Sequence, residues 1–314
     1  MNKDTVYTIK KTSSGLGFML FIASVSMYTL SLILVLVLQN ILDNAMLLLA
    51  NIVVSIVSLF VVGMFYCWIS KTNPADVINV RWVKLSTAVP LILVGLTVAY
   101  IADYLTELIQ SSFGMFGVEN AVDMTTKSPT LFESILNIVS VCVIPALVEE
   151  FLFRGIVLGK LRAFGDSFAM FMTSMAFALM HGNIVQIPFA FIVGLSLAFI
   201  TIKTDSLLPA VIIHFIVNFR SVIVSVITDN NILTEDTLNL IYILLSFALI
   251  ALGIASAAIL SRRRNFFKFE QKPDIPFRGA LRASILSVGM IFFIINCVLT
   301  TIQTVSLSSL FGGG

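Results

Sequence analysis

The stretch ALVEEFLFRG places two adjacent glutamates and an arginine, Glu149, Glu150 and Arg154, inside an almost purely apolar run. The chain has only two histidines, His181 and His214, and both also lie in apolar segments. Ionisable residues in a lipid-spanning segment are costly and point to function by default. A carboxylate shielded from bulk water can act as a general base, and an imidazole can hold water or stabilise an oxyanion. These residue types therefore indicate a hydrolytic site.

Helical spacing decides which of these side chains can meet. Glu150 and Arg154 are four residues apart, so they share a helix face and can form an ion pair. Glu149 is rotated by ~100° from Glu150 and points elsewhere. The stretch HFIVN places His214 and Asn218 four residues apart, again on one face. An imidazole and a carboxamide on one face can both donate hydrogen bonds to a developing oxyanion.

The expected helices also bring these groups to similar depth. Glu149 lies sixteen residues before Gly165 and His181 sixteen after it, so a hairpin that turns there sets them level. Glu149 lies ~16 Å from Lys160, and His214 lies ~14 Å from the preceding turn, at 1.5 Å per residue. Three helices should therefore aim an acid, two imidazoles and an amide into one pocket, nearer the cytoplasmic face.

Two alternatives stay open at this point. Glu149, His181 and His214 could instead ligate a divalent metal such as zinc, which would itself generate hydroxide, and spacing does not choose between the two chemistries. The pair Glu150–Arg154 could also be purely structural. Farther along the chain, Arg220 is expected to pair with an acidic residue of another helix, either Asp103 or Glu107.

Composition defines the elements that must hold the site. Of the 314 residues, 58% are hydrophobic and 11% charged, about half the charge of a soluble domain, and the mean hydropathy is +1.03. Apolar runs long enough to cross a bilayer as helices recur along the chain. We expect an all-α, polytopic transmembrane bundle of about nine spans. Their expected ranges are 16–38, 45–69, 85–108, 131–152 with a helical continuation to 164, 168–181, 187–202, 207–227, 238–260 and 284–310.

Basic residues are distributed unevenly between the loops of this layout. Alternate loops, beginning with the N-terminal one, hold Lys3, Lys10, Lys11, Lys71, Arg81, Lys84, Lys160, Arg162, Lys203, Arg262, Arg263, Arg264, Lys268, Lys272, Arg278 and Arg282. The intervening loops hold Lys127 and the acidic residues Asp43, Glu119, Asp123, Asp229, Glu235 and Asp236. Loops rich in Lys and Arg stay in the cytoplasm. The sequence therefore predicts a cytoplasmic N-terminus and a C-terminus on the opposite side.

Three elements together resemble a known family. EEFLFR at Glu149–Arg154, FALMH at Phe177–His181 and HFIVN at His214–Asn218 occur in the order E-E-x-x-x-R, F-x-x-x-H, H-x-x-x-N. This pattern is similar to that of the CAAX-protease and bacteriocin-processing (CPBP, Abi) family of intramembrane proteases, related to the Ras-converting enzyme. The resemblance covers residues 131 to about 227.

The resemblance implies a role for each matching residue. Glu149 would be the water-activating base and His181 its partner on the same water. His214 and Asn218 would stabilise the oxyanion, and Glu150 with Arg154 would hold the helix and place substrate or water. The family is often described as metalloproteases, although a metal-free glutamate mechanism is also argued for it, so a bound metal stays open.

Other protease classes fit the sequence less well. There is no H-E-x-x-H zinc motif and no G-x-S-G serine motif. Two non-proteolytic functions remain as alternatives, a non-catalytic membrane scaffold or immunity protein and, with less support because no repeat is found, a proton-coupled transporter.

The expected organisation is three-part. Helices of residues 1–130 precede a catalytic core at 131–228, and residues 229–314 add further helices. The expected partners are the lipid bilayer and a peptide or membrane-protein substrate, with no nucleic acid. Short loops and the lack of a targeting sequence favour a bacterial cell membrane and peptide or membrane-protein substrates over prenylated ones.

Overall fold

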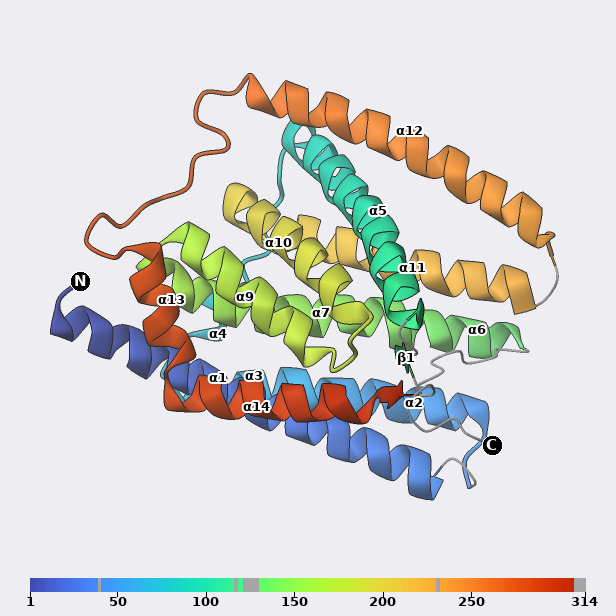
Figure 1. Ribbon diagram of the computed structural model, residues 1–314, viewed down its shortest axis with the longest axis horizontal. Helices are drawn as coiled ribbons and strands as arrows, with labels where there is room; N and C mark the ends of the chain where they lie inside the picture. Colours follow the sequence, from blue (N-terminus) through green and yellow to red (C-terminus); the bar gives the residue numbers. More distant parts are fainter. Residues whose placement is uncertain (39–40, 116–117, 121–129, 230–231, 308–314) are drawn as a thin grey trace.

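The protein is an elongated bundle of helices (Figure 1). The computed structural model describes residues 1–314 except 39–40, 116–117, 121–129, 230–231 and 308–314, so the predictions for Asp123 and Lys127 lie outside the described residues. Within the described ranges the only strands are β1 (Val118–Asn120) and β2 (Val305–Leu307), which form one short antiparallel pair. The all-α, polytopic fold class is confirmed.

The helices follow the expected apolar segments. Their bounds are α1 (Lys3–Ile33), α2 (Asn44–Ser55), α3 (Val62–Ile69), α4 (Pro74–Val77), α5 (Leu85–Met115), α6 (Leu131–Asn137), α7 (Ile144–Glu150), α8 (Gly159–Leu161), α9 (Asp166–Met180), α10 (Gln186–Thr204), α11 (Leu208–Asp229), α12 (Glu235–Ser261), α13 (Phe277–Ile285) and α14 (Val288–Gln303). Wider π-type turns extend α1 to Leu38 and join α2 to α3. Similar turns join α6, α7 and α8 into one helix, Leu131–Phe164.

Seven helices among the described residues are long and apolar enough to cross a membrane, or eight if the bent pair α13–α14 is one span. The fifth expected span corresponds to α9, which has 15 residues and is shorter than the seven helices that could cross a membrane. The expected start of the last span at 284 is corrected, because α13 and α14 are bent by 72° at a break and the apolar helix begins at Val288. The count of nine and the orientation of the N-terminus stay predictions.

Small residues allow the closest helix contacts. α1 packs along α14 (Figure 1). A Cβ at Gly17 of α1 would lie 2.2 Å from the backbone nitrogen of Met290, and a Cβ at Gly289 of α14 would lie 2.0 Å from the carbonyl oxygen of Ser14. Close approach through small residues is the usual way in which helices associate in lipid. The outward faces stay apolar. Phe247 and Ile254 of α12, for example, are 69% and 65% exposed, as lipid-facing side chains would be.

The loops rich in lysine and arginine gather at one end of the bundle, which we name the basic end. Arg81, in the segment before α5, pairs with Asp205 in the turn between α10 and α11. Asp166, at the start of α9, accepts a hydrogen bond from the backbone of Glu270, and Lys203 donates to the carbonyl of Lys268. The long link between α12 and α13 therefore lies against the α8–α9 and α10–α11 turns (Figure 1). The side of the membrane that this end faces stays a prediction.

Candidate active site

The two glutamates lie at the end of α7, in the middle of the helix Leu131–Phe164. This helix begins with a capping box in which Thr130 and Glu133 satisfy each other's backbone N–H groups. It winds with wider π-type turns over Ile138–Val143 and again over Phe151–Leu158, directly after the glutamates. Such widened turns occur frequently at functional sites.

The predicted pair of Glu150 and Arg154 is present and fully buried. Arg154 donates to Glu150 Oε1 at 2.9 Å, and both side chains have no exposed surface. The guanidinium also donates to the carbonyl of Gly194 in α10 at 3.3 Å. A buried arginine is tolerated only with such partners, because an unpaired charge in the interior is strongly destabilising. The pair therefore fixes the direction in which the carboxylate of Glu150 points.

The imidazole of His214, on α11, lies between the two glutamates. Its Nδ1 donates to Glu150 Oε1 at 2.8 Å, and its Nε2 lies 3.9 Å from Glu149 Oε2. One carboxylate oxygen of Glu150 thus holds both Arg154 and His214. A carboxylate at one imidazole nitrogen sets the orientation of the ring and leaves the other nitrogen for chemistry. The contact joins residues 64 positions apart, and the sequence did not predict it.

His181 directly follows the last residue of α9. Its Nδ1 donates to the carbonyl of Phe177 at 2.8 Å, so Nε2 is left for other partners. Gly182 follows with φ +57°, a left-handed conformation that turns the chain toward α10 with little strain. His181 is exposed although it lies among helices, because it lines three separate cavities.

Phe177 connects these groups, and its position in the middle of the cluster was not predicted. Its ring lies edge-on to the rings of His181 and His214, with centroids 4.9 and 5.9 Å away. The guanidinium of Arg154 lies over the same ring at 4.3 Å, a cation–π contact. The signal for Phe177 was in the sequence, as the first residue of the F-x-x-x-H element, although the spacing gave it no role.

The smallest cavity at the site is shared by Glu149 and His181. Its volume is about 40 Å³, and Met27, Leu59, Phe153 and Met180 complete its lining. This volume is enough for one or a few water molecules, and two polar groups face it. The expectation that Glu149 and His181 meet at the same depth is met, and the carboxylate of Glu149 is only 17% exposed.

Asn218 lies on a second, larger cavity. Its amide donates to the carbonyl of Val141 at 3.0 Å, which holds the group in place and leaves the other amide hydrogen free to bond elsewhere. The cavity has a volume of about 450 Å³ and is also lined by His181 and by polar residues of α5 and α10, including Glu107, Gln110 and Gln186. His181 therefore separates a water-sized pocket from a much larger polar one.

The geometry does not favour a metal site. Within the described part of the chain, no three His, Cys, Asp or Glu side chains come close enough together to hold an ion. One nitrogen of each imidazole is hydrogen-bonded, to Glu150 in His214 and to Phe177 in His181, and because metal-ligating histidines also make such bonds, this feature does not decide the question. The alternative in which Glu149, His181 and His214 ligate zinc thus gains no support from the donor set.

A second charged cluster lies between α5, α11 and α12. Arg220 pairs with Asp103, and Tyr242 donates to the same carboxylate at 3.3 Å. The guanidinium also lies over the rings of Tyr100 and Tyr242, at 4.9 and 5.7 Å. Of the two partners that the sequence left open for Arg220, the structure selects Asp103.

A family model matches the part of the chain that forms this site. Residues 131–220 match the model of the family described as type II CAAX prenyl endopeptidase Rce1-like. The match includes all six candidate residues, Glu149, Glu150, Arg154, His181, His214 and Asn218. Searches of curated proteins and of solved structures gave no match.

The match covers under a third of the chain and supports the expected resemblance to the CAAX-protease (CPBP) family. Together with its apolar helices, the match identifies an integral, multi-pass membrane protein. The description of the matching family supports, in general terms, the function of a CAAX-protease-like intramembrane endopeptidase. The boundaries of the three-part organisation, at 130 and 228, stay predictions.

Proposed function

We propose that the protein is an endopeptidase that cuts a peptide or a membrane-protein segment by Glu149-activated water, in the cytoplasmic half of a bacterial cell membrane. The observation that carries the proposal is the small cavity shared by Glu149 and His181, with His214 Nε2 3.9 Å from the Glu149 carboxylate. The cavity has room for water, and its lining comes from α1, the α2–α3 helix, the helix Leu131–Phe164 and the end of α9.

In this proposal Glu149 removes a proton from the water while the water oxygen attacks the scissile carbonyl carbon. The new C–O bond forms and the π electrons of the carbonyl move to the carbonyl oxygen. Glu149 later returns the proton to the departing amine as the C–N bond breaks. His181 holds the water through Nε2, since its Nδ1 hydrogen is bonded to Phe177. General-base assistance of this kind contributes about 10²–10⁴ in rate.

His214 and Asn218 stabilise the oxyanion that forms. Asn218 has one amide hydrogen left after its bond to Val141, and His214 donates when it carries a proton on Nε2. Donors held in place before the reaction need no reorganisation as charge develops. Glu150 and Arg154 act as positioning residues, because Glu150 contacts His214 and Arg154 contacts Glu150.

The substrate occupies the cavity of about 450 Å³ on the other side of His181. This cavity is lined by both His181 and Asn218, so a peptide carbonyl there would face the attacking water and an amide donor. Its lining of carboxylate and carboxamide groups suits an extended peptide backbone, which needs hydrogen-bond partners at regular intervals when it is removed from water.

The test is cleavage of a pool of quenched fluorescent peptides by the purified protein in detergent. Wild type should release fluorescence, and Glu149→Gln should lower the rate about a hundredfold or more, because an amide cannot accept the proton. Glu133→Gln is the matched control: it makes the same change in the same helix, and glutamine can replace glutamate in a capping box. Cleavage that survives Glu149→Gln would contradict the assignment of Glu149 as the general base. A cellular phenotype that is the same in cells carrying Glu149→Gln and in cells carrying wild type would favour the scaffold alternative.

A further inference from the structure

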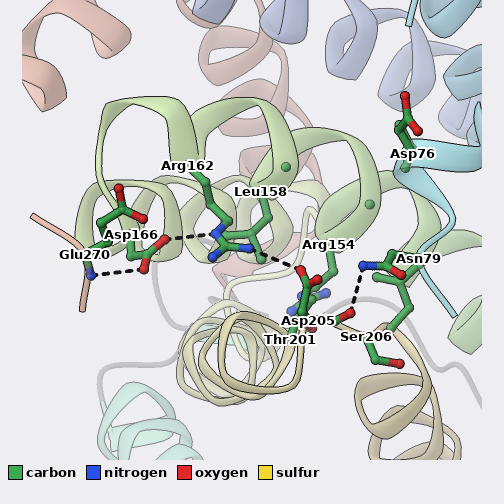
Figure 2. A pocket seen from close by; sticks show the side chains of 14 residues that line it. Asp76, Asn79, Arg154, Leu158, Arg162, Asp166, Thr201, Asp205, Ser206 and Glu270 are labelled. Atoms are coloured by element: carbon green, nitrogen blue, oxygen red, sulfur yellow. Dashed lines mark hydrogen bonds and ion pairs between the residues drawn. The ribbon is translucent and has the colours of Figure 1, made fainter. Parts of the chain in front are cut away.

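A separate polar cavity of about 320 Å³ opens at the basic end (Figure 2). Its lining includes Asp76 and Asn79 from the segment before α5, Arg162 and Asp166 from the α8–α9 turn, and Asp205 from the α10–α11 turn. This volume holds about ten waters at the density of the liquid. The proposed reaction makes no use of these groups.

The walls of this cavity are held by contacts between distant parts of the chain. Arg162 donates to Asp166 at 2.9 Å and lies 3.7 Å from Asp205 (Figure 2). Asn79 donates to the carbonyl of Asp205 at 2.8 Å, and the backbone N–H of Glu270 donates to Asp166 at 3.2 Å. Four segments are therefore tied around the opening, so the cavity is preformed.

The inner wall of the cavity includes Arg154, the buried arginine of the active site. Among the described residues, Arg154 Nε and Glu150 Oε2 are buried and have no hydrogen-bond partner. Buried polar atoms in proteins are nearly always satisfied, if not by protein then by ordered water. Arg154 lines the cavity and its partner Glu150 contacts His214, so these two unsatisfied atoms are the polar groups that a water entering from this cavity would meet on its way to the imidazole.

We propose that this cavity is the inlet through which hydrolytic water reaches the active site from the basic end. The inference rests on the proposed hydrolysis, which consumes one water for each bond cut. A peptide in the cavity of about 450 Å³ obstructs access from that side. Water then reaches the site from another side, and in this proposal it passes from the cavity at the basic end past Arg154, whose partner Glu150 contacts His214.

Gly159 offers a way to block this inlet without disturbing the fold. It lines the cavity, and a Cβ built on it would have no described atom of a neighbouring element within 4 Å. Gly155, one turn earlier, has no such room, because a Cβ there would lie 2.8 Å from Val77. A larger side chain at Gly159 would therefore fill the cavity while improving helix propensity.

The first experiment measures hydration without relying on proteolysis. Leu158→Cys places a thiol on the cavity wall, and Leu152→Cys places one at equal burial on the same helix away from it. We expect trimethylammonium-ethyl methanethiosulfonate to label the Leu158→Cys thiol faster, as read by mass spectrometry, and Gly159→Leu to slow that labelling. The three native cysteines are buried and set the background. Equal labelling at both positions would overturn the inlet.

The second experiment measures the rate of cleavage of the same peptide pool. Gly159→Leu should lower the rate about tenfold, which corresponds to about 1.4 kcal/mol in the barrier, whereas Gly159→Ala adds little volume and should stay near wild type. A wild-type rate for folded Gly159→Leu would refute the proposal. If wild type cleaves nothing, the proposed function fails, and the labelling result still decides whether the cavity is hydrated.

Discussion

Two arginine–carboxylate clusters lie within the helical bundle, and they differ in what else they contact. The pair of Glu150 and Arg154 has no exposed side-chain surface and also binds His214. The pair of Asp103 and Arg220 is 23% and 20% exposed and is surrounded by tyrosines. The first cluster therefore connects to an imidazole beside a water-sized cavity, whereas the second joins three long helices and lines the larger cavity in which the substrate is proposed to bind.

The difference shows why a charge inside a membrane protein is not sufficient evidence for catalysis. Both clusters satisfy the requirement that an intramembrane charge be paired. The first contains an imidazole placed by a carboxylate, the arrangement that orients this ring for reaction. Mutations that keep the charge pair of the first cluster should thus lower kcat more than stability. Mutations in the second cluster should lower stability and substrate binding, and should leave kcat nearly unchanged.

The largest effect is expected for Arg154→Met. This change leaves the carboxylate of Glu150 buried without its arginine, and breaking a buried pair costs about 3–5 kcal/mol. The free energy of unfolding, measured by denaturant titration in mixed micelles, should fall by that order. The double variant Arg154→Met/Glu150→Leu should recover much of the loss, because it removes both charges. A single variant as stable as wild type would show that the pair is hydrated or otherwise compensated.

A smaller effect is expected for Glu150→Gln. The amide keeps the size of the side chain but binds the His214 Nδ1–H less strongly, so the imidazole is less well held. Losing such a positioning partner lowers activity by about 10–100-fold. The rate of peptide-pool cleavage by the folded variant should fall by this factor. The thermal unfolding midpoint should fall as well, because Arg154 stays buried without a charged partner, but less than for Arg154→Met, because the glutamine oxygen can still accept from Arg154. Replacement of Glu150 by aspartate, which retains the charge, should restore part of the rate, and a rate equal to wild type in the glutamine variant would contradict the positioning role.

The smallest effect is expected for Asp103→Asn. The amide can still accept from Tyr242 and Arg220, and the pair is partly exposed, so the free energy of unfolding should fall by only about 1 kcal/mol. Any effect on cleavage should appear in KM and not in kcat, because Asp103 lines the proposed substrate cavity and does not line the water-sized one. A fall in kcat larger than the loss of stability, both expressed as free energies, would mean that this cluster takes part in the chemistry and would remove the distinction.

Much of the site was predictable because it is local. Hydropathy located the helices, and helix periodicity paired Glu150 with Arg154, since residues four apart share a face in any helix. Equal spacing from the turn at Gly165 placed Glu149 and His181 at one level, and they line one cavity. The break between α13 and α14 was not predicted, because the apolar composition runs across it.

The sequence by itself determined that this is a multi-pass helical membrane protein, and it predicted six candidate site residues. Only the tertiary structure decided that Glu150 holds His214, that Phe177 contacts both imidazoles, and that Arg220 binds Asp103 instead of Glu107. It also decided that a polar cavity reaches Arg154 from the basic end. The physical reason is that contacts between helices depend on how each helix is rotated and tilted, and these depend on the packing of all its neighbours together.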